Sequence, residues 1–241
     1  MPFPKIRIVM VETSHPGNIG AAARALKNMC LDSLYLVRPH HFPHPEAISR
    51  ASGADDILDN AVVCDSLAEA LHGCHRVYGA SARARRTIPW PQVDARGCAN
   101  EVAQLPAETT VAVVFGREHS GLSNEELELC HSLLHIPCNP NYSSLNVAAA
   151  IQVVSYELHM ASLQGEGKVL EETEEQLATS DELEGLFEHL ERVMLTTGFL
   201  DPDNPRQLMR RLRRLYLRSR LEKIELNILR GILTSVEKPK Y

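Results

Sequence analysis

Between Lys5 and Leu163 the sequence alternates between two hydrophobic periodicities, and this alternation is its strongest constraint on the fold. Short apolar segments rich in β-branched residues are typical of buried strands, whereas apolar positions that recur three or four residues apart predict helices. We expect strands at residues 6–11, 33–37, 61–64, 76–80, 110–115 and 133–136. This order predicts an α/β domain with a mostly parallel sheet that is covered on both faces.

Two helices of this region have recognisable beginnings. Ser66 and Ser123 each precede a helical pattern, and Glu69 and Glu126 follow them at the spacing of a capping box. Further helices are expected at 19–29, near 45–51, at 94–104 and from residue 145 onward. Arg24 falls among small apolar residues in the first of these, where we expect the helix to pack closely on the sheet.

The strand pattern ends after Leu163. Residues 164–180 are rich in glycine and glutamate, as expected of a linker, and three helical patterns follow. We therefore predict an α/β domain over residues 1–163, an acidic linker over 164–180 and a small helical extension over 181–241.

The composition is that of a soluble globular protein, with 44% hydrophobic and 23% charged residues in a chain of 241. The start of the sequence lacks the pattern of a signal peptide, and no segment approaches transmembrane length, so we expect a cytoplasmic protein that does not enter membranes. The six cysteines are scattered without metal-site spacing, which predicts no metal centre. A net charge of −6 disfavours indiscriminate coating of nucleic acid, but basic residues cluster between Arg206 and Arg230.

Three polar loops follow predicted strands, at residues 80–90, 116–122 and 137–146. Ligands of parallel sheets bind beyond the carboxyl ends of the strands, so these loops are expected to converge on one pocket. Pro137 and Pro140 hold the third loop extended ahead of a helix. Helix capping alone would explain one or two of the polar residues there, but not the whole run.

Familiar nucleotide-binding and hydrolase signatures are missing from the sequence. The first loop has Gly17 and Gly20 but not the Rossmann spacing, and there is no P-loop, H-E-x-x-H or G-x-S-x-G. Three other motifs occur in a fixed order: N-x-G-x-x-x-R at residues 18–24, V-V-F-G-R-E-x-x-G-L at 113–122, and I-P-x-x-P-N-Y-S-S-L-N-V-A at 136–148.

This ordered trio resembles the three motifs of the SpoU branch of the SPOUT methyltransferases. The resemblance implies a trefoil-knotted α/β fold, S-adenosyl-L-methionine as cofactor and a homodimer with active sites near the subunit interface. Flanking matches at residues 11–20, 81–91 and 225–233 are most similar to the members that methylate the ribose 2′-oxygen of nucleotide 32 (cytidine or uridine) in the tRNA anticodon loop. Together these matches cover nearly the whole chain except the acidic linker.

Other functions stay open on the sequence alone. The chain could methylate a ribose at another tRNA or rRNA site, or it could be an RNA-binding SPOUT module without turnover. A Rossmann-like enzyme acting on a small molecule is a more remote alternative.

The resemblance implies a set of cofactor contacts, made largely by backbone groups. These contacts are expected at Ala80, Ser81, Ala82, Gly116, Ile136, Ser143, Ser144, Leu145 and Asn146. The small residues 148–150 at the start of the following helix would suit close packing in a dimer.

The resemblance also makes Arg24 the principal catalytic candidate. Because arginine stays protonated in proteins, we expect it to clamp a phosphate or stabilise the developing alkoxide rather than accept a proton. Tyr142, Ser144, a phosphate or water could aid proton removal. Asn18 and Glu118 would orient Arg24 or the ribose, although loop capping explains them equally well.

RNA contacts are predicted in three places. His15 lies in the loop after the first strand and could touch RNA, although a lone histidine beside a proline is usually structural or merely exposed. Arg83, Arg85 and Arg86 precede Trp90, the only tryptophan, which could stack on an unpaired base. A solvated loop explains any one of these arginines equally well. The third set lies in the helical extension and comprises Arg210, Arg211, Arg213 and Arg214, which would contact the tRNA backbone.

Overall fold

The computed structural model describes residues 3–81, 90–142, 144–165 and 176–238. The strands are β1 (Lys5–Val11), β2 (Ser33–Val37), β3 (Val62–Cys64), β4 (Arg76–Ala80), β5 (Gln92–Asp94), β6 (Thr110–Phe115) and β7 (Ser132–His135). The helices are α1 (Pro16–Asn28), α2 (Pro45–Ala51), α3 (Asp55–Asp59), α4 (Leu67–Leu71), α5 (Ala95–Val102), α6 (Asn124–Glu128), α7 (Val147–Gly165), α8 (Ser180–Thr196), α9 (Leu208–Ser219) and α10 (Lys223–Glu237).

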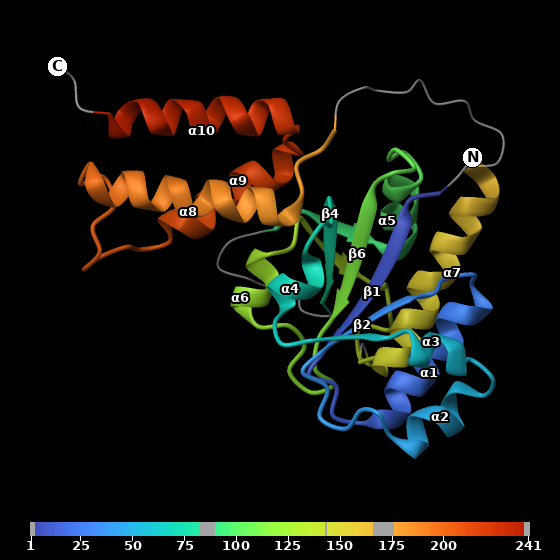
Figure 1. The fold of residues 1–241 in the computed structure, drawn as a ribbon. Helices are drawn as coiled ribbons and strands as arrows, with labels where there is room; N and C mark the ends of the chain where they lie inside the picture. Colours follow the sequence, from blue (N-terminus) through green and yellow to red (C-terminus); the bar gives the residue numbers. More distant parts are fainter. Residues whose placement is uncertain (1–2, 82–89, 143, 166–175, 239–241) are drawn as a thin grey trace.

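The described strands form one seven-stranded sheet in the order β3-β2-β1-β6-β4-β7-β5 (Figure 1). Every pairing between these strands is parallel, which confirms the predicted α/β class. The six expected strands are present near their predicted positions. The trefoil knot that the family resemblance implies stays a prediction.

Alternate residues of the central strands enter two different cores, as the two-residue period of a strand requires. Ile8 and Met10 of β1 join a core with α1, α2, α3, α5 and α7, whereas Val9 and Val11 join a second core with α4. The second core also contains Leu186 and other residues of the C-terminal helices. Both faces of the sheet are therefore covered, and the C-terminal helices help to cover one of them (Figure 1).

The C-terminal segment is joined to the α/β region by polar contacts as well. Thr179 caps α8 in a full capping box with Glu182, and the amide of Ser180 donates to the carbonyl of Cys74 at 2.7 Å. Asp181 accepts a hydrogen bond from the amide of Gly73 at 3.0 Å. The division at residues 163 and 180 stays a prediction, but α8 begins directly against the α/β region.

Two short elements, α3 and β5, were not predicted. They have five and three residues, too few for a hydrophobic period to be recognised. The prediction that Trp90 is available for base stacking is wrong: the side chain is only 8% exposed, and its indole nitrogen donates to the carbonyl of Cys130 at 2.7 Å. Trp90 instead belongs to the second core.

Candidate active site

The loop of residues 12–15 leads from β1 into the first motif, and we call it the first motif loop. The carboxylate of Glu118 from the second motif holds this loop in place. Its oxygens accept hydrogen bonds from the amide and hydroxyl of Ser14 (3.2 and 3.1 Å), the amide of His15 (3.3 Å) and the side-chain amide of Asn18 (2.9 Å). His15 precedes α1 without capping it through its side chain. Glu118 therefore places a negative charge at the amino end of α1, where the helix dipole and free amides favour it.

Asn18 connects this arrangement to the third motif. Its side-chain oxygen accepts a hydrogen bond from the side-chain nitrogen of Asn146 at 2.9 Å. The side-chain oxygen of Asn146 in turn accepts from the amides of Ala148 (2.9 Å) and Ala149 (3.3 Å) at the start of α7. One hydrogen-bonded chain, Glu118–Asn18–Asn146, thus joins residues from all three motifs.

The electrostatics of Glu118 fit this positioning role. Burial would raise its pKa, but the hydrogen bonds from Asn18, Ser14 and His15 outweigh burial, so the pKa of Glu118 lies below its ordinary value. The carboxylate is therefore ionised at neutral pH and acts as a hydrogen-bond acceptor only.

The loop of the second motif is closed so tightly that it requires glycine at residue 116. A Cβ added to Gly116 would lie 2.2 Å from the carbonyl carbon of Gly121, which is far inside van der Waals contact. Arg117 and Gly121 exchange backbone hydrogen bonds of 3.2 and 2.9 Å across the loop, and Gly121 has a φ of 69°. Both glycines are therefore needed to hold the backbone of residues 116–122 in this shape.

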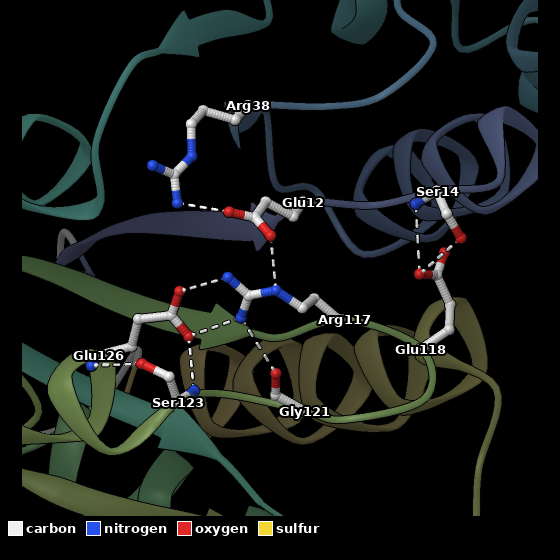
Figure 2. A network of polar contacts seen from close by, with 8 residues as sticks. All are labelled: Glu12, Ser14, Arg38, Arg117, Glu118, Gly121, Ser123 and Glu126. Carbon is white, nitrogen blue, oxygen red and sulfur yellow. Dashed lines mark hydrogen bonds and ion pairs between the residues drawn. The ribbon is translucent and has the colours of Figure 1, made fainter.

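Figure 2 shows the guanidinium of Arg117 between Glu12, Glu126 and the carbonyl of Gly121, where it supports this loop. Its guanidinium donates to Glu12 at 2.6 Å and, through two nitrogens, to both oxygens of Glu126 at 2.9 and 3.0 Å. Glu126 also accepts from the amide of Ser123 and completes the predicted capping box of α6. Glu12 also pairs with Arg38. The hydrogen bond from Arg117 does most to lower the pKa of Glu12, and the contact with Arg38 lowers it further.

Arg117 and Glu12 were not predicted as site residues. The sequence did contain a signal, because Arg117 lies inside the second motif beside Glu118. Its partner Glu12 lies 105 residues away in the chain, and such a pair is not visible without the fold.

Arg24 is exposed on α1, although the small residues beside it in the sequence pack closely, as expected for this helix. Ala22, Ala23 and Ala25 are the buried residues, and Arg24 points away from the core that they join. The close approach of α1 to α2 explains the small residues of α1. A Cβ at Gly20 would lie only 2.0 Å from the carbonyl oxygen of Ala47 in α2. Arg24 makes no hydrogen bond or ion pair with any residue that the structure describes.

The predicted cofactor loops follow strands that are neighbours in the sheet. The order β6-β4-β7 places the carboxyl ends of these three strands side by side, and the amide of Ser81 donates to the carbonyl of Leu134 at 2.9 Å. Ala80, Gly116 and Ile136 are half-buried at these ends. This is the edge at which parallel sheets bind nucleotide-like ligands. Ala82, Arg83, Arg85, Arg86 and Ser143 lie outside the described residues.

The third motif leaves several predicted residues in solvent. Tyr142 is 79% exposed, Leu145 is 42% exposed, and Ser144 is exposed as well. Among the described residues of one chain, the side chains of Tyr142 and Ser144 form no hydrogen bond with Asn18, Arg24 or Glu118. Their catalytic assignments therefore stay predictions.

The C-terminal arginines differ in what they contact. Arg210 forms an ion pair with Glu128, and Arg213 pairs with Glu184 while its guanidinium lies 4.6 Å from the ring centre of Phe187. Arg214 is half-buried, and Arg211 is exposed. Among these four, Arg211 is best placed for an RNA contact, whereas Arg210 and Arg213 hold the helices in place.

Two kinds of feature are absent from the described residues. No three histidine, cysteine, aspartate or glutamate side chains among them gather into a group that could hold a metal ion. In the same part of the chain, none of the helices combines the length and apolar character needed to cross a bilayer.

Comparisons with known proteins identify the family to which the chain belongs. Residues 5–156 match the model of the SpoU rRNA Methylase family, and residues 181–241 match that of the tRNA methyltransferase TrmJ, C-terminal domain. The chain is similar to TrmJ of Pseudomonas aeruginosa, with 56% identity over 97% of this chain and 94% of the relative. It is 51% identical to TrmJ of Escherichia coli K12 over 96% of this chain and 95% of that protein.

The fold is also similar to a solved structure over nearly its whole length. The crystal structure of TrmJ from Z. mobilis superposes with a TM-score of 0.83 and 33% identity, covering 96% of this chain and 99% of that one. The expected family and enzyme class are thereby confirmed. The chain belongs to the SpoU family of methylases, within the branch that carries the TrmJ C-terminal domain.

Proposed function

We propose that this protein uses S-adenosyl-L-methionine to methylate the ribose 2′-oxygen of nucleotide 32 in the tRNA anticodon loop. The observation that carries the proposal is the hydrogen-bonded chain Glu118–Asn18–Asn146, which joins the three family motifs at the carboxyl edge of the sheet. The names of the relatives support the substrate class, since both describe tRNA 2′-O-methyltransferases. The choice of nucleotide 32 rests on the sequence resemblance.

The base at the target position is a finer question. The name of the Pseudomonas aeruginosa relative includes cytidine, uridine and adenosine, whereas that of the Escherichia coli relative includes only cytidine and uridine. Because the chain is 56% identical to the former, we include adenosine among the nucleotides to be tested.

The reaction is an in-line displacement at a methyl carbon. S-adenosyl-L-methionine, when bound, supplies a methyl group on a positively charged sulfur. The ribose 2′-oxygen forms the new bond to this carbon as the carbon–sulfur bond breaks, the electron pair stays on sulfur, and the hydroxyl proton passes to an acceptor. The protein must therefore align the hydroxyl, stabilise negative charge on its oxygen and exclude competing water.

Arg24 is suited to the second of these tasks. Its guanidinium is exposed and, within the described residues, makes no intrachain ion pair, so it is free to bind a phosphate or a developing alkoxide. Glu118 and Asn18 act differently: they fix the loop that leads into the helix carrying Arg24. We assign Arg24 as the catalytic residue, and Glu118 and Asn18 as positioning residues.

A homodimer would complete this site. The exposed face of α7 carries Ala149, Val153 and Tyr156, and the exposed Leu145 precedes the helix at the same spacing, so that an apolar stripe is left without a partner among the described residues. The stripe begins within the third motif, beside the predicted cofactor residues. A second copy packed there would bury the stripe and bring Tyr142 and Ser144 into an enclosed site.

The proposal is tested by incubating unmodified tRNA with the purified protein and S-adenosyl-L-methionine, then mapping methylated nucleotides by mass spectrometry of nuclease fragments. A 2′-O-methyl group at nucleotide 32, with none in a reaction lacking protein, is the expected result. Transcripts with cytidine, uridine, adenosine or guanosine at that position define the base preference. Methylation confined to another nucleotide would overturn the assignment of position 32.

A further inference from the structure

A small cavity lies between the sheet and the C-terminal helices. Its polar lining comes from His75 and Arg76 where β4 begins, from His131 ahead of β7, and from Tyr216 and Arg220 in and directly after α9. Leucine and alanine side chains line the rest. Because β4 and β7 are parallel and the cavity is at their amino ends, it lies at the opposite edge of the sheet from the predicted cofactor loops.

Arg76 is the most unusual residue of this cavity, because a guanidinium is seldom buried in a protein. Its side chain belongs to a residue that is only 5% exposed. One nitrogen, Nη2, donates to Glu101 at 3.2 Å and to Ser132 at 3.0 Å. Nε and Nη1 are buried as well, and no described residue accepts a hydrogen bond from either of them. Since buried N–H groups of native proteins nearly always have a partner, these two donors require an acceptor.

The charges beside the cavity do not cancel. Arg76 and Arg220 share one carboxylate, that of Glu101, whose Oε2 accepts from them at 3.2 and 3.0 Å. Lys223 and Glu182 form a separate ion pair at 3.4 Å. The cluster of Arg76, Arg220 and Glu101 therefore carries one more positive charge than negative charges, and an anion in the cavity would balance it.

The two histidines add further donors to the cavity. Nδ1 of His131 accepts a hydrogen bond from the amide of Val77 at 3.1 Å, and Nδ1 of His75 accepts one from the amide of Thr110 at 3.1 Å. Burial, followed by the charges of two nearby arginines, lowers the pKa of His131 to about 3, and burial also lowers the pKa of His75. Both rings are therefore neutral at neutral pH and carry their proton on Nε2, where each is a donor.

The size and the chemistry of the cavity limit what it can hold. Its volume of about 10 Å³ corresponds to about one water-sized sphere, which is too small for phosphate or another polyatomic anion. Among the described residues that line it, no side chain is a carboxylate or an amide. A water molecule would bring two donors of its own to a lining rich in donors, whereas a monoatomic anion only accepts.

We infer that this cavity binds one monoatomic anion, which we identify as chloride, between Arg76 of β4 and the residues of α9. The ion accepts hydrogen bonds from the two buried nitrogens of Arg76 and balances the charge that Glu101 leaves uncompensated. It thereby makes the attachment of the C-terminal helices to the sheet dependent on chloride. The inference does not rest on the proposed function, because the cavity is at the other edge of the sheet.

The test is the dependence of stability on chloride at constant ionic strength. Urea unfolding of the full-length protein would be recorded while potassium chloride replaces potassium gluconate, whose anion is too large for the cavity. A ligand that binds only the folded protein stabilises it as the binding site fills. Once chloride exceeds its dissociation constant, the equilibrium constant for unfolding should fall about tenfold for each tenfold increase in chloride.

Arg76→Met removes both donors and the excess charge, so chloride should bind about tenfold or more weakly, as expected when hydrogen bonds to a charged group are lost. Arg213→Met is the matched control. Arg213 is another largely buried arginine of α9, with a side chain that is 19% exposed and paired with Glu184, and it does not line the cavity. This control should lower stability but keep the chloride dependence. If Arg76→Met does not fold, Arg220→Gln replaces it, because this variant keeps Arg76 and should also weaken chloride binding by removing the excess charge.

Two results in solution would overturn the inference. Equal stability of the natural protein in chloride and in gluconate would show that the cavity does not bind chloride. An unchanged chloride dependence in Arg76→Met, or in Arg220→Gln where that variant replaces it, would show that chloride binds elsewhere in the protein.

A crystal grown in bromide locates the ion directly. We expect anomalous density beside Nε and Nη1 of Arg76 in the natural protein. Density at other positions alone would show an adventitious ion only, and it would overturn the inference.

Discussion

Arg24 is the residue on which the chemistry depends most, and its exposure gives a sharp test. Arg24→Ala removes a guanidinium without disturbing the buried neighbours Ala23 and Ala25. The variant should fold normally and bind S-adenosylhomocysteine with unchanged affinity, while methylation falls by about 100-fold or more because charge stabilisation at a reacting oxygen is lost. Calorimetry and single-turnover assays measure the two quantities separately. Weaker cofactor binding with normal turnover at saturation would show that Arg24 serves the cofactor instead.

A substitution of Glu118 tests whether this carboxylate positions the motif loops. Glu118→Gln places an amide donor where Ser14, His15 and Asn18 all donate, so the free energy of unfolding at neutral pH should fall by about 1–2 kcal/mol. Because the pKa of Glu118 is lowered in the folded protein, its stabilisation is present above the unfolded pKa of about 4.3. That stabilisation is lost as the pH falls through the folded pKa.

The difference in the free energy of unfolding between the natural protein and Glu118→Gln should therefore disappear on acidification below about pH 4. Urea unfolding across the pH range measures it. Glu108→Gln is the control, since Glu108 is exposed on a different loop. A Glu118→Gln protein as stable as the natural one at neutral pH would show that the carboxylate does not hold the motif loops.

At the scale of elements, Arg117 connects β1, the second motif loop and α6. Arg117→Met should lower the free energy of unfolding by about 2–4 kcal/mol, because it removes the cation between two partly buried carboxylates and leaves Glu126 without an ion pair, while Glu12 keeps only Arg38. It should also weaken binding of S-adenosylhomocysteine, because the loop of residues 116–122 loses its support. Arg117→Lys should restore only part of either property, since an ammonium cannot pair with both oxygens of Glu126 in parallel.

Arg38→Met provides the comparison for this prediction. Arg38 pairs only with Glu12, and its side chain is 56% exposed. Arg38→Met should therefore lower the free energy of unfolding and the cofactor affinity only slightly. Equal effects of Arg38→Met and Arg117→Met would contradict the assignment of Arg117 as the support of the cofactor loop.

The elements also show where sequence patterns succeed. Ser66 and Ser123 begin helices as predicted, because capping uses residues three positions apart. At Ser66, however, the Glu69 carboxylate accepts from the amide of Asp65, so the second half of the capping box is not formed there. The motif residues Asn18, Glu118 and Asn146 do come together, but which of them contact each other could be seen only in the folded structure.

At the scale of the whole molecule, the sequence predicted separate regions but not how they pack. Arg76 is 5% exposed and shares the carboxylate of Glu101 with Tyr78 and with Arg220 of the C-terminal segment. The three donors are 23 to 119 residues from Glu101 in the chain, and the hydrophobic periodicity of the sequence does not predict contacts over such separations. The burial of Trp90 was missed for the same reason, since its partner Cys130 is 40 residues away.

This packing decides how a role of the C-terminal helices in RNA binding is tested. Deleting everything after Leu163 would uncover the sheet face that Leu186 and Phe187 cover, so loss of binding could reflect unfolding. Arg211→Glu is a better probe because Arg211 is exposed. It should weaken tRNA binding and reduce the log–log salt slope by about one unit, with no loss of stability.

Arg213→Met serves as the control for this prediction. Arg213 pairs with Glu184 inside the chain, so this variant should lower stability while leaving the salt slope unchanged. The same salt slope in the Arg211→Glu variant as in the natural protein would remove Arg211 from the RNA-binding surface.

The proposed acceptor is one particular oxygen, the ribose 2′-oxygen of nucleotide 32, and a single substitution in the RNA tests this assignment. Two tRNA transcripts would be compared in assays with radiolabelled S-adenosyl-L-methionine: one with ribose throughout, and one with 2′-deoxyribose at nucleotide 32 alone. Since the proposed acceptor is then missing, we predict full methylation of the first transcript and none of the second. Equal incorporation into both would contradict the proposed site of reaction.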